Sequence, residues 1–331
     1  MSKDTKIVSK VLVHEFEKTS LTLLKDVCIE NNLVGLRVKT EDDHIGLEGA
    51  SSEFDEVLSS NLDLGSVFLT EAPDSSGVSG LDLCLQIHRK RPELPIFLRR
   101  VTRKELSPEV LQAIAGSYEN NNIDQLNGLI NEYICSMYYP LELAKGFQEI
   151  STQVFESLIP GVKVHCDYPY LVKDQLIYGE LFTLIPLESD WCRGYMMLQT
   201  TEKEITDLIR SDATAIHSMR PNRNDINSIL NEATNLIWGK ARSCYFSSVE
   251  SLEGNRIYVP TLVNHSQKHM SFGSTEPQLC FKFKLIDPKF RFDEITIYQR
   301  LIFNLSWSPE KFTENDQIVE HLVENGDLEM F

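Results

Sequence analysis

The chain has 331 residues, of which 42% are hydrophobic and 24% are charged, and its formal net charge is −17. This length is typical of two domains of roughly 100–200 residues each. The sequence has no apolar run of about 18 residues, so we predict no membrane-spanning helix. The acidic balance disfavours general binding to nucleic-acid phosphates. Segment 1–10 is polar and lacks the apolar centre of a secretory signal, so we expect a cytoplasmic protein.

Strands and helices alternate through the first 137 residues. The apolar runs predict strands at 10–13, 66–70 and 95–98, and helices at 21–29, 80–88, 108–115 and 123–135. Pro108 stands in the first turn of its helix, where proline is tolerated. This alternation predicts an α/β domain over residues 1–137, with a parallel sheet covered on both faces.

The segments 67–81 and 91–98 resemble the middle of a response-regulator receiver domain. Segments 94–98 and 108–113 are also similar to the receiver-like wing domain of the ornithine, lysine and arginine decarboxylases, but the chain is too short for the large cofactor domain of those enzymes. The resemblance covers roughly residues 8–135 and implies a flavodoxin-like fold.

A working receiver carries two acids after its first strand, an aspartate after the third, a hydroxyl residue after the fourth and a lysine after the fifth. The corresponding residues here are His14 and Glu15, then Glu71, then Arg99 or Arg100, and finally Asn120 or Asn121. The resemblance therefore implies a degenerate receiver that has lost its chemistry and acts as a scaffold. The alternative is that the carboxylate of Glu71 imitates a phosphoaspartate.

Seven lysines and arginines gather between His88 and Lys104, with Glu93 as the only acid among them. Such a stretch either binds an anion or pairs with the surplus acids of the chain, and we favour ion pairing.

Residues 138–331 are expected to form a second domain, of the α+β class. Its predicted elements are a helix at 141–158, strands at 162–166, 176–187 and 194–200, helices at 202–219 and 225–242, and strands at 256–262, 279–286 and 294–304. This order predicts an antiparallel sheet with its helices on one side.

The helix at 225–242 carries the candidate site. Ile226, Leu230 and Ile237 belong to its apolar stripe. Glu232 and Asn235 are three residues apart, so they are neighbours on one face, away from the centre of that stripe. Gly239 allows another backbone element or a partner to approach closely.

This helix resembles the E-x-x-N helix of the CheC, CheX and FliY phosphatases, most closely the CheX branch. The matching residues are Glu232, Ala233, Thr234 and Asn235, followed by 236–241, which includes Gly239 and Lys240. The resemblance covers roughly residues 140–305. It implies a phosphatase acting on the phosphoaspartate of a CheY-like partner receiver, with docking around Gly239 and Lys240.

In this family pattern, Asn235 would orient the attacking water and Glu232 would pair with the partner's lysine. The partner would supply Mg²⁺, and this chain would carry no cofactor or metal of its own. The resemblance also implies a homodimer held by sheet edges, for which we expect segment 279–286 to offer an edge. The alternative function is a non-catalytic dimeric signalling adaptor with a pseudo-receiver domain.

The cysteines and histidines predict no further chemistry. The seven cysteines show no C-x-x-C spacing and are expected to be reduced thiols. His265 and His269 are four residues apart, but their polar surroundings predict a loop and not a metal site.

Overall fold

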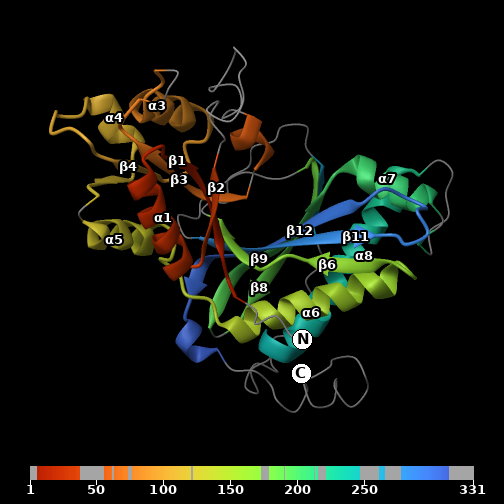
Figure 1. Cartoon of the computed structure of the whole chain (residues 1–331). Coiled ribbons are helices and arrows are strands. Elements are labelled where there is room, and N and C mark those ends of the chain that lie inside the picture. The colour runs from red at the N-terminus through yellow and green to blue at the C-terminus, as the bar shows by residue number, and fades with distance from the viewer. Residues whose placement is uncertain are drawn as a thin grey trace.

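Two sheets organise the protein (Figure 1). The computed structural model describes residues 6–37, 56–61, 63–73, 77–120, 122–172, 179–189, 191–211, 213–214, 221–246, 261–264 and 277–312. We call the portion built on the first sheet, up to residue 133, the α/β part, and the portion from residue 141 onward the antiparallel part. No helix in these ranges is both long and apolar enough to cross a bilayer.

The α/β part has a five-stranded parallel sheet. Its strands are β1 (Ser9–His14), β2 (Leu33–Arg37), β3 (Leu64–Thr70), β4 (Ile96–Arg99) and β5 (Gly116–Tyr118). Their order is β2-β1-β3-β4-β5, which is the flavodoxin-like order. In such sheets the carboxyl ends of the central strands form the usual site of chemistry.

Helices cover both faces of this sheet, as predicted. They are α1 (Lys18–Glu30), α3 (Gly80–Lys90), α4 (Pro108–Ala113) and α5 (Ile123–Tyr133). One core joins α1 and α5 to alternate residues of the strands, such as Val11 and Phe97. The other joins α3 and α4 to the opposite residues, such as Leu12 and Leu98. The sequence analysis did not predict β2 and β5, which are short and lie at the two edges of the sheet.

The antiparallel part has a seven-stranded sheet in the order β10-β8-β9-β12-β11-β6, with β7 also paired to β11. The strands are β6 (Lys163–Cys166), β7 (Tyr170–Val172), β8 (Leu181–Glu188), β9 (Cys192–Thr200), β10 (Thr261–Asn264), β11 (Gln278–Ile286) and β12 (Ile295–Trp307). The helices α6 (Leu141–Leu158), α7 (Glu202–Arg210) and α8 (Arg223–Ala241) share one core with one face of the sheet. The predicted antiparallel sheet with helices on one side is confirmed.

Two predictions in this part were wrong. The helix expected over 202–219 ends at Arg210, where the hydroxyl and amide of Ser211 turn back onto the carbonyl of Leu208. Segment 279–286 offers no edge, because β11 pairs with β12 on one side and with β6 and β7 on the other. Homodimerisation itself stays a prediction. Residues 256–260 of the strand expected at 256–262 lie outside the described residues, as do His265 and His269.

The short strand β7, which the sequence analysis also did not predict, connects the two sheets. The amide of Val8 donates to the carbonyl of Pro169 (2.9 Å), and the amide of Leu171 donates back to Val8 (2.8 Å). The Ser9 hydroxyl adds a bond to the Leu171 carbonyl (3.1 Å). The junction therefore lies at the amino ends of the parallel strands, which leaves their carboxyl ends pointing away from the antiparallel part.

Candidate functional site

Helix α8 is fixed at its start and along one side. Asn222 caps it by accepting from the amides of Asn224 (2.7 Å) and Asp225 (3.2 Å), while the Asp225 carboxylate accepts from the Asn222 amide. Such a capping box satisfies backbone donors that would otherwise be unpaired. The apolar stripe of α8 is buried, with Leu230 at 1% and Ile237 at 0% exposure. This stripe packs against α6 and the sheet.

A buried polar contact fixes the rotation of α8 about its own axis. The Thr234 hydroxyl, at 0% exposure, lies 2.6 Å from the Thr183 hydroxyl on β8. Side chains advance by about 100° per residue around a helix, so residues two before and one after Thr234 turn away from the sheet. The sequence predicted the shared face of Glu232 and Asn235, and the structure exposes both side chains.

Glu232 and Asn235 lie side by side on this exposed face. Residues at this spacing have Cβ atoms about 5–6 Å apart. Within the described ranges, neither side chain makes a hydrogen bond or an ion pair. A carboxylate acceptor thus stands beside a carboxamide that both donates and accepts. This pair can bind a cation and a water molecule at adjacent positions.

Two further residues of this face were not identified from the sequence. Leu236 is 40% exposed and so adds apolar surface to this face. Ser228 is exposed one turn before Glu232, and its hydroxyl donates to the carbonyl of Asn224. Each of these two residues is four positions from Glu232, and this spacing could have placed them on the same helix face from the sequence alone. We call Ser228, Glu232, Asn235, Leu236 and Gly239 the exposed stripe of α8.

Gly239 faces open space. A Cβ added there would meet no atom within 4 Å, and the backbone is ordinary helix. Within the described part of the chain no element approaches this glycine, so packing does not explain it. A glycine inside a helix costs roughly 0.5–1 kcal/mol relative to alanine. Lys240 beside it is half-buried.

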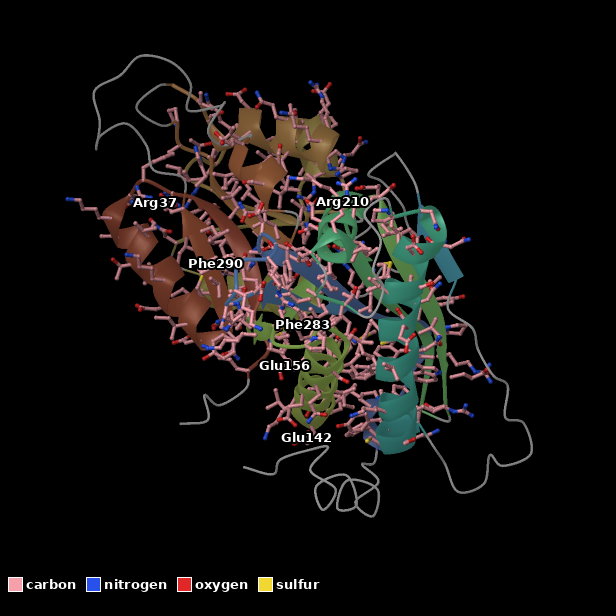
Figure 2. All side chains as sticks on the ribbon, turned by 90° about the vertical axis from the view of Figure 1, so that its right-hand side faces the viewer. Arg37, Glu142, Glu156, Arg210, Phe283 and Phe290 are labelled. Atoms are coloured by element: carbon pink, nitrogen blue, oxygen red, sulfur yellow. The ribbon has the colours of Figure 1, made fainter. Side chains whose placement is uncertain are left out.

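The α/β part does not cover the exposed stripe. In Figure 1, α8 lies on the far side of the antiparallel sheet from the parallel sheet. Figure 2, turned by 90°, shows α8 in teal at the opposite side of the molecule from the red α1. The neighbours of α8 are α6, α7, β8, β9, β10 and the π-helical turn Arg242–Phe246. Within the described ranges, these neighbours leave the exposed stripe uncovered.

The residues predicted to correspond to the receiver positions make contacts within the chain. Arg99, at the end of β4, donates through Nε (2.5 Å) and Nη2 (2.9 Å) to the two carboxylate oxygens of Glu15. Glu15 is only 2% exposed and also accepts from the amides of Phe16 and Glu17. The Arg99 guanidinium thus lies directly against both oxygens of the Glu15 carboxylate.

Glu71 follows β3 and is equally engaged. One of its oxygens accepts from the amides of Val101 (2.7 Å) and Thr102 (2.9 Å) and from Nε of Arg100 (3.2 Å). The other accepts from the Thr102 hydroxyl (2.6 Å). Burial alone would raise the pKa of Glu71, but these hydrogen bonds outweigh it and lower the pKa to about 2. Glu71 is therefore a charged structural group that holds the loop after β4.

The remaining receiver positions also differ from a working site. His14 is buried and packs edge-on against Phe16, with ring centroids 4.4 Å apart. Asn120 donates to the Ser20 hydroxyl (2.6 Å), and Asn121 lies outside the described residues. Among the residues that the structure describes, no group of three or more histidines, cysteines or acids could hold a metal ion.

The basic stretch 88–104 does not form one patch. Arg91 pairs with Glu93, Arg99 with Glu15, and Arg100 with Glu71, so ion pairing accounts for three of its arginines. Its other cations are divided between the end of α3 and the loop after β4, at opposite ends of the sheet. For these three arginines, the structure agrees with the prediction that the basic stretch pairs with acids of the chain.

All seven cysteines are free thiols, and five of them are buried. Burial raises the pKa of Cys28 and of Cys84 to about 11, so both thiols stay protonated near neutral pH.

No family model and no curated protein matches the chain. Solved structures of two kinds are similar to parts of it. A putative chemotaxis protein from Desulfovibrio vulgaris Hildenborough is 18% identical, with 48% of this chain and 95% of that chain covered and a TM-score of 0.36. A chain of the CheX–CheY–BeF3–Mg2+ complex from Borrelia burgdorferi is 11% identical, with 48% and 96% covered and a TM-score of 0.33. The signal receiver domain of a modulated diguanylate cyclase from Desulfovibrio desulfuricans G20 is 15% identical, with 39% and 95% covered and a TM-score of 0.29.

Proposed function

We propose that this protein is a signalling phosphatase that hydrolyses the phosphoaspartate of a partner response regulator at the exposed stripe of α8. The observation that carries the proposal is the pair of Glu232 and Asn235. Both are exposed and adjacent, and neither is bonded to a described residue. The resemblance of 232–241 to the E-x-x-N helix gives the pair its roles.

The chemistry needs little from the protein except positioning. A phosphoaspartate hydrolyses when water attacks phosphorus in line with the leaving carboxylate, and orientation dominates the rate of such steps. The Asn235 carboxamide would accept from this water and direct its lone pair at phosphorus. Glu232 would bind the partner's lysine through a charge-assisted bond and so fix the register of docking. Mg²⁺ would belong to the partner's site.

The α/β part has a different role in this proposal. With Glu15 and Glu71 engaged by Arg99, Arg100 and the loop after β4, it would serve as a scaffold that takes no phosphoryl group. It is attached through β7, away from α8, so its described residues would not block a separate receiver at the stripe. A dimeric adaptor is the alternative function, and it would tolerate a covered or inert α8.

The deciding experiment follows the decay of phosphorylated receivers from the same organism, with and without this protein. We expect at least one receiver to lose its phosphoryl group faster in the presence of wild-type protein. The double variant Glu232→Ala with Asn235→Ala should lose this acceleration while staying folded. If wild-type protein accelerates the decay of none of these receivers, the adaptor function is favoured.

A further inference from the structure

An apolar groove lies in the α/β part, between α1 and the edge strand β2. It encloses about 260 Å³. Its floor and walls are formed by apolar groups of three elements: Val13, Leu21, Leu24, Cys28, Leu33 and Gly35. The groove is unrelated to α8 and to the degenerate receiver positions, so neither proposed role of the chain uses it.

The alternation of β2 explains why the groove is open. Leu33, Gly35 and Arg37 point to the face that carries α1, because side chains alternate along a strand. A Cβ at Gly35 would make only ordinary contacts, with Val13 Cγ2 at 3.8 Å and Cys28 Sγ at 3.9 Å. A larger side chain would therefore fit there and fill the groove. Glycine within a strand often marks a place where a ligand or another backbone approaches.

The rim of the groove combines apolar and cationic groups. Ile29 is 75% exposed at the end of α1, so its apolar surface is available to whatever occupies the groove. Lys25 and Arg37 are both exposed at the rim, and neither forms an ion pair within the described ranges. Figure 2 places Arg37 at the outer margin of the molecule, opposite α8. Two cations with no acidic partner among the described residues are notable in a chain whose net charge is −17.

We propose that this groove binds a small amphiphile with an apolar body and a single anionic head, such as a medium-chain carboxylate. The volume lies just below the roughly 300–1,000 Å³ of typical ligand pockets, which favours a small ligand. The apolar body would lie against Leu24, Cys28 and Leu33 and would cover Ile29. The carboxylate would reach Lys25 and Arg37, whose charges complement it.

Binding is tested by calorimetry with three probes that share one apolar body: octanoate, 1-octanol and octylammonium. We expect wild-type protein to bind octanoate saturably at one site, 1-octanol more weakly and octylammonium least. Gly35→Leu should abolish octanoate binding. Lys25→Glu with Arg37→Glu should weaken it by roughly tenfold or more, since charge-assisted contacts are lost.

Two matched controls keep the result specific. Gly128→Leu adds a leucine at an exposed, equally open glycine on α5, outside the groove wall, and should bind octanoate like wild type. Lys18→Glu with Lys203→Glu makes the same change in net charge at exposed sites elsewhere and should also bind normally. The charge variants are at exposed positions, so they test the proposal even if Gly35→Leu fails to fold.

Three results would overturn the proposal. The first is the absence of saturable octanoate binding to wild-type protein. The second is unchanged octanoate binding by a folded Gly35→Leu variant or by the Lys25/Arg37 double variant. The third is equal affinity for all three probes. A change of oligomeric state in Gly35→Leu, without probe binding by wild type, would instead assign the groove to a second copy of this chain.

Discussion

The hydroxyl groups of Thr183 and Thr234 lie 2.6 Å apart at the contact between β8 and α8, and both side chains are fully buried. Thr234 also donates to the Leu230 carbonyl (2.7 Å), so its single proton is used there and Thr183 must donate the shared bond. Because Thr234 is held against the sheet, Glu232 and Asn235 project away from it. The candidate site thus depends on a contact between residues 51 positions apart.

The two halves of this contact should differ in their effect on stability. Thr234→Val leaves the buried Thr183 donor without an acceptor, which costs about 1–3 kcal/mol. Thr183→Val removes only the donor, and Thr234 keeps its bond to Leu230, so we expect a loss nearer about 1 kcal/mol. Urea unfolding followed by tryptophan fluorescence measures both, because all three tryptophans lie in the antiparallel part. Equal losses would contradict this assignment of donor and acceptor.

Glu71 should make the α/β part sensitive to acid. Its pKa is about 2 in the folded protein against a usual 4.5. A carboxylate with a lowered pKa stabilises the fold above its unfolded pKa, and that contribution is lost as the pH falls from about 4.5 towards 2. At about 1.4 kcal/mol per pKa unit, the contribution near neutral pH is at most about 3.5 kcal/mol.

Glu71→Gln keeps the shape of the side chain but removes its charge. We expect this variant to be less stable than wild type at pH 7 and to approach wild type as the pH falls towards 2. Hydrogen exchange of the β3 amides reports the stability of this part, which has no tryptophan. Glu105→Gln, at an exposed position in the loop after β4, is the matched control and should show no such trend. A constant difference between Glu71→Gln and wild type across this range would contradict the role of the Glu71 charge.

The α/β part should not accept a phosphoryl group. Glu71 stands where a working receiver is expected to carry its phosphorylated aspartate. The carboxylates of Glu15 and Glu71 also accept hydrogen bonds from donors within the chain. Incubation with acetyl phosphate and Mg²⁺ should leave the mass of the protein unchanged, while a working receiver under the same conditions gains one phosphoryl group. A stoichiometric, acid-labile phosphoryl adduct on the α/β part would contradict this prediction.

Sequence patterns predicted the long elements, because their apolar residues recur with a clear period. Helix α6 was predicted with its observed ends, Leu141 and Leu158. The strands β2, β5 and β7 were missed because they have three to five residues and exist only through pairing with distant strands. β2 also has exposed residues and an internal glycine, which weaken any strand pattern.

For the candidate site, spacing alone predicted that Glu232 and Asn235 share a face. It could not predict that Thr183 would orient that face, nor that Arg99 would bind Glu15, which is 84 residues away. Both contacts depend on how distant elements pack together and not on any local pattern. The exposure of Leu236 likewise follows from how α8 sits on the sheet.

Gly239 offers a test in which stability and docking should change in opposite directions. A Cβ at this position meets nothing, so Gly239→Ala should raise the free energy of unfolding by about 0.5–1 kcal/mol through better helix propensity. If a partner approaches the helix at this point, Gly239→Leu should weaken receiver docking although the fold is intact. Fluorescence anisotropy with a labelled receiver, beside urea unfolding, measures both. Unchanged docking in Gly239→Leu would exclude close approach at this residue.

The roles of Glu232 and Asn235 can be separated by comparing rate with affinity. If Asn235 orients the water, Asn235→Ala should remove most turnover and leave the affinity for the phosphorylated receiver nearly unchanged. If Glu232 binds the partner's lysine, Glu232→Ala should weaken affinity as well as rate, by roughly ten- to a hundredfold for the loss of about 1.5–3 kcal/mol.

Both side chains are exposed and without described bonds, so each change should move stability by less than about 0.5 kcal/mol. Asn224→Ala is the matched control, an exposed asparagine on the same helix, about 16 Å along its axis from Asn235 at 1.5 Å per residue. It should leave both rate and affinity unchanged, because it lies beyond the exposed stripe. Wild-type turnover in both site variants would show that other residues carry the reaction. Equal losses of affinity in both variants would mean that Asn235 serves docking and not the water.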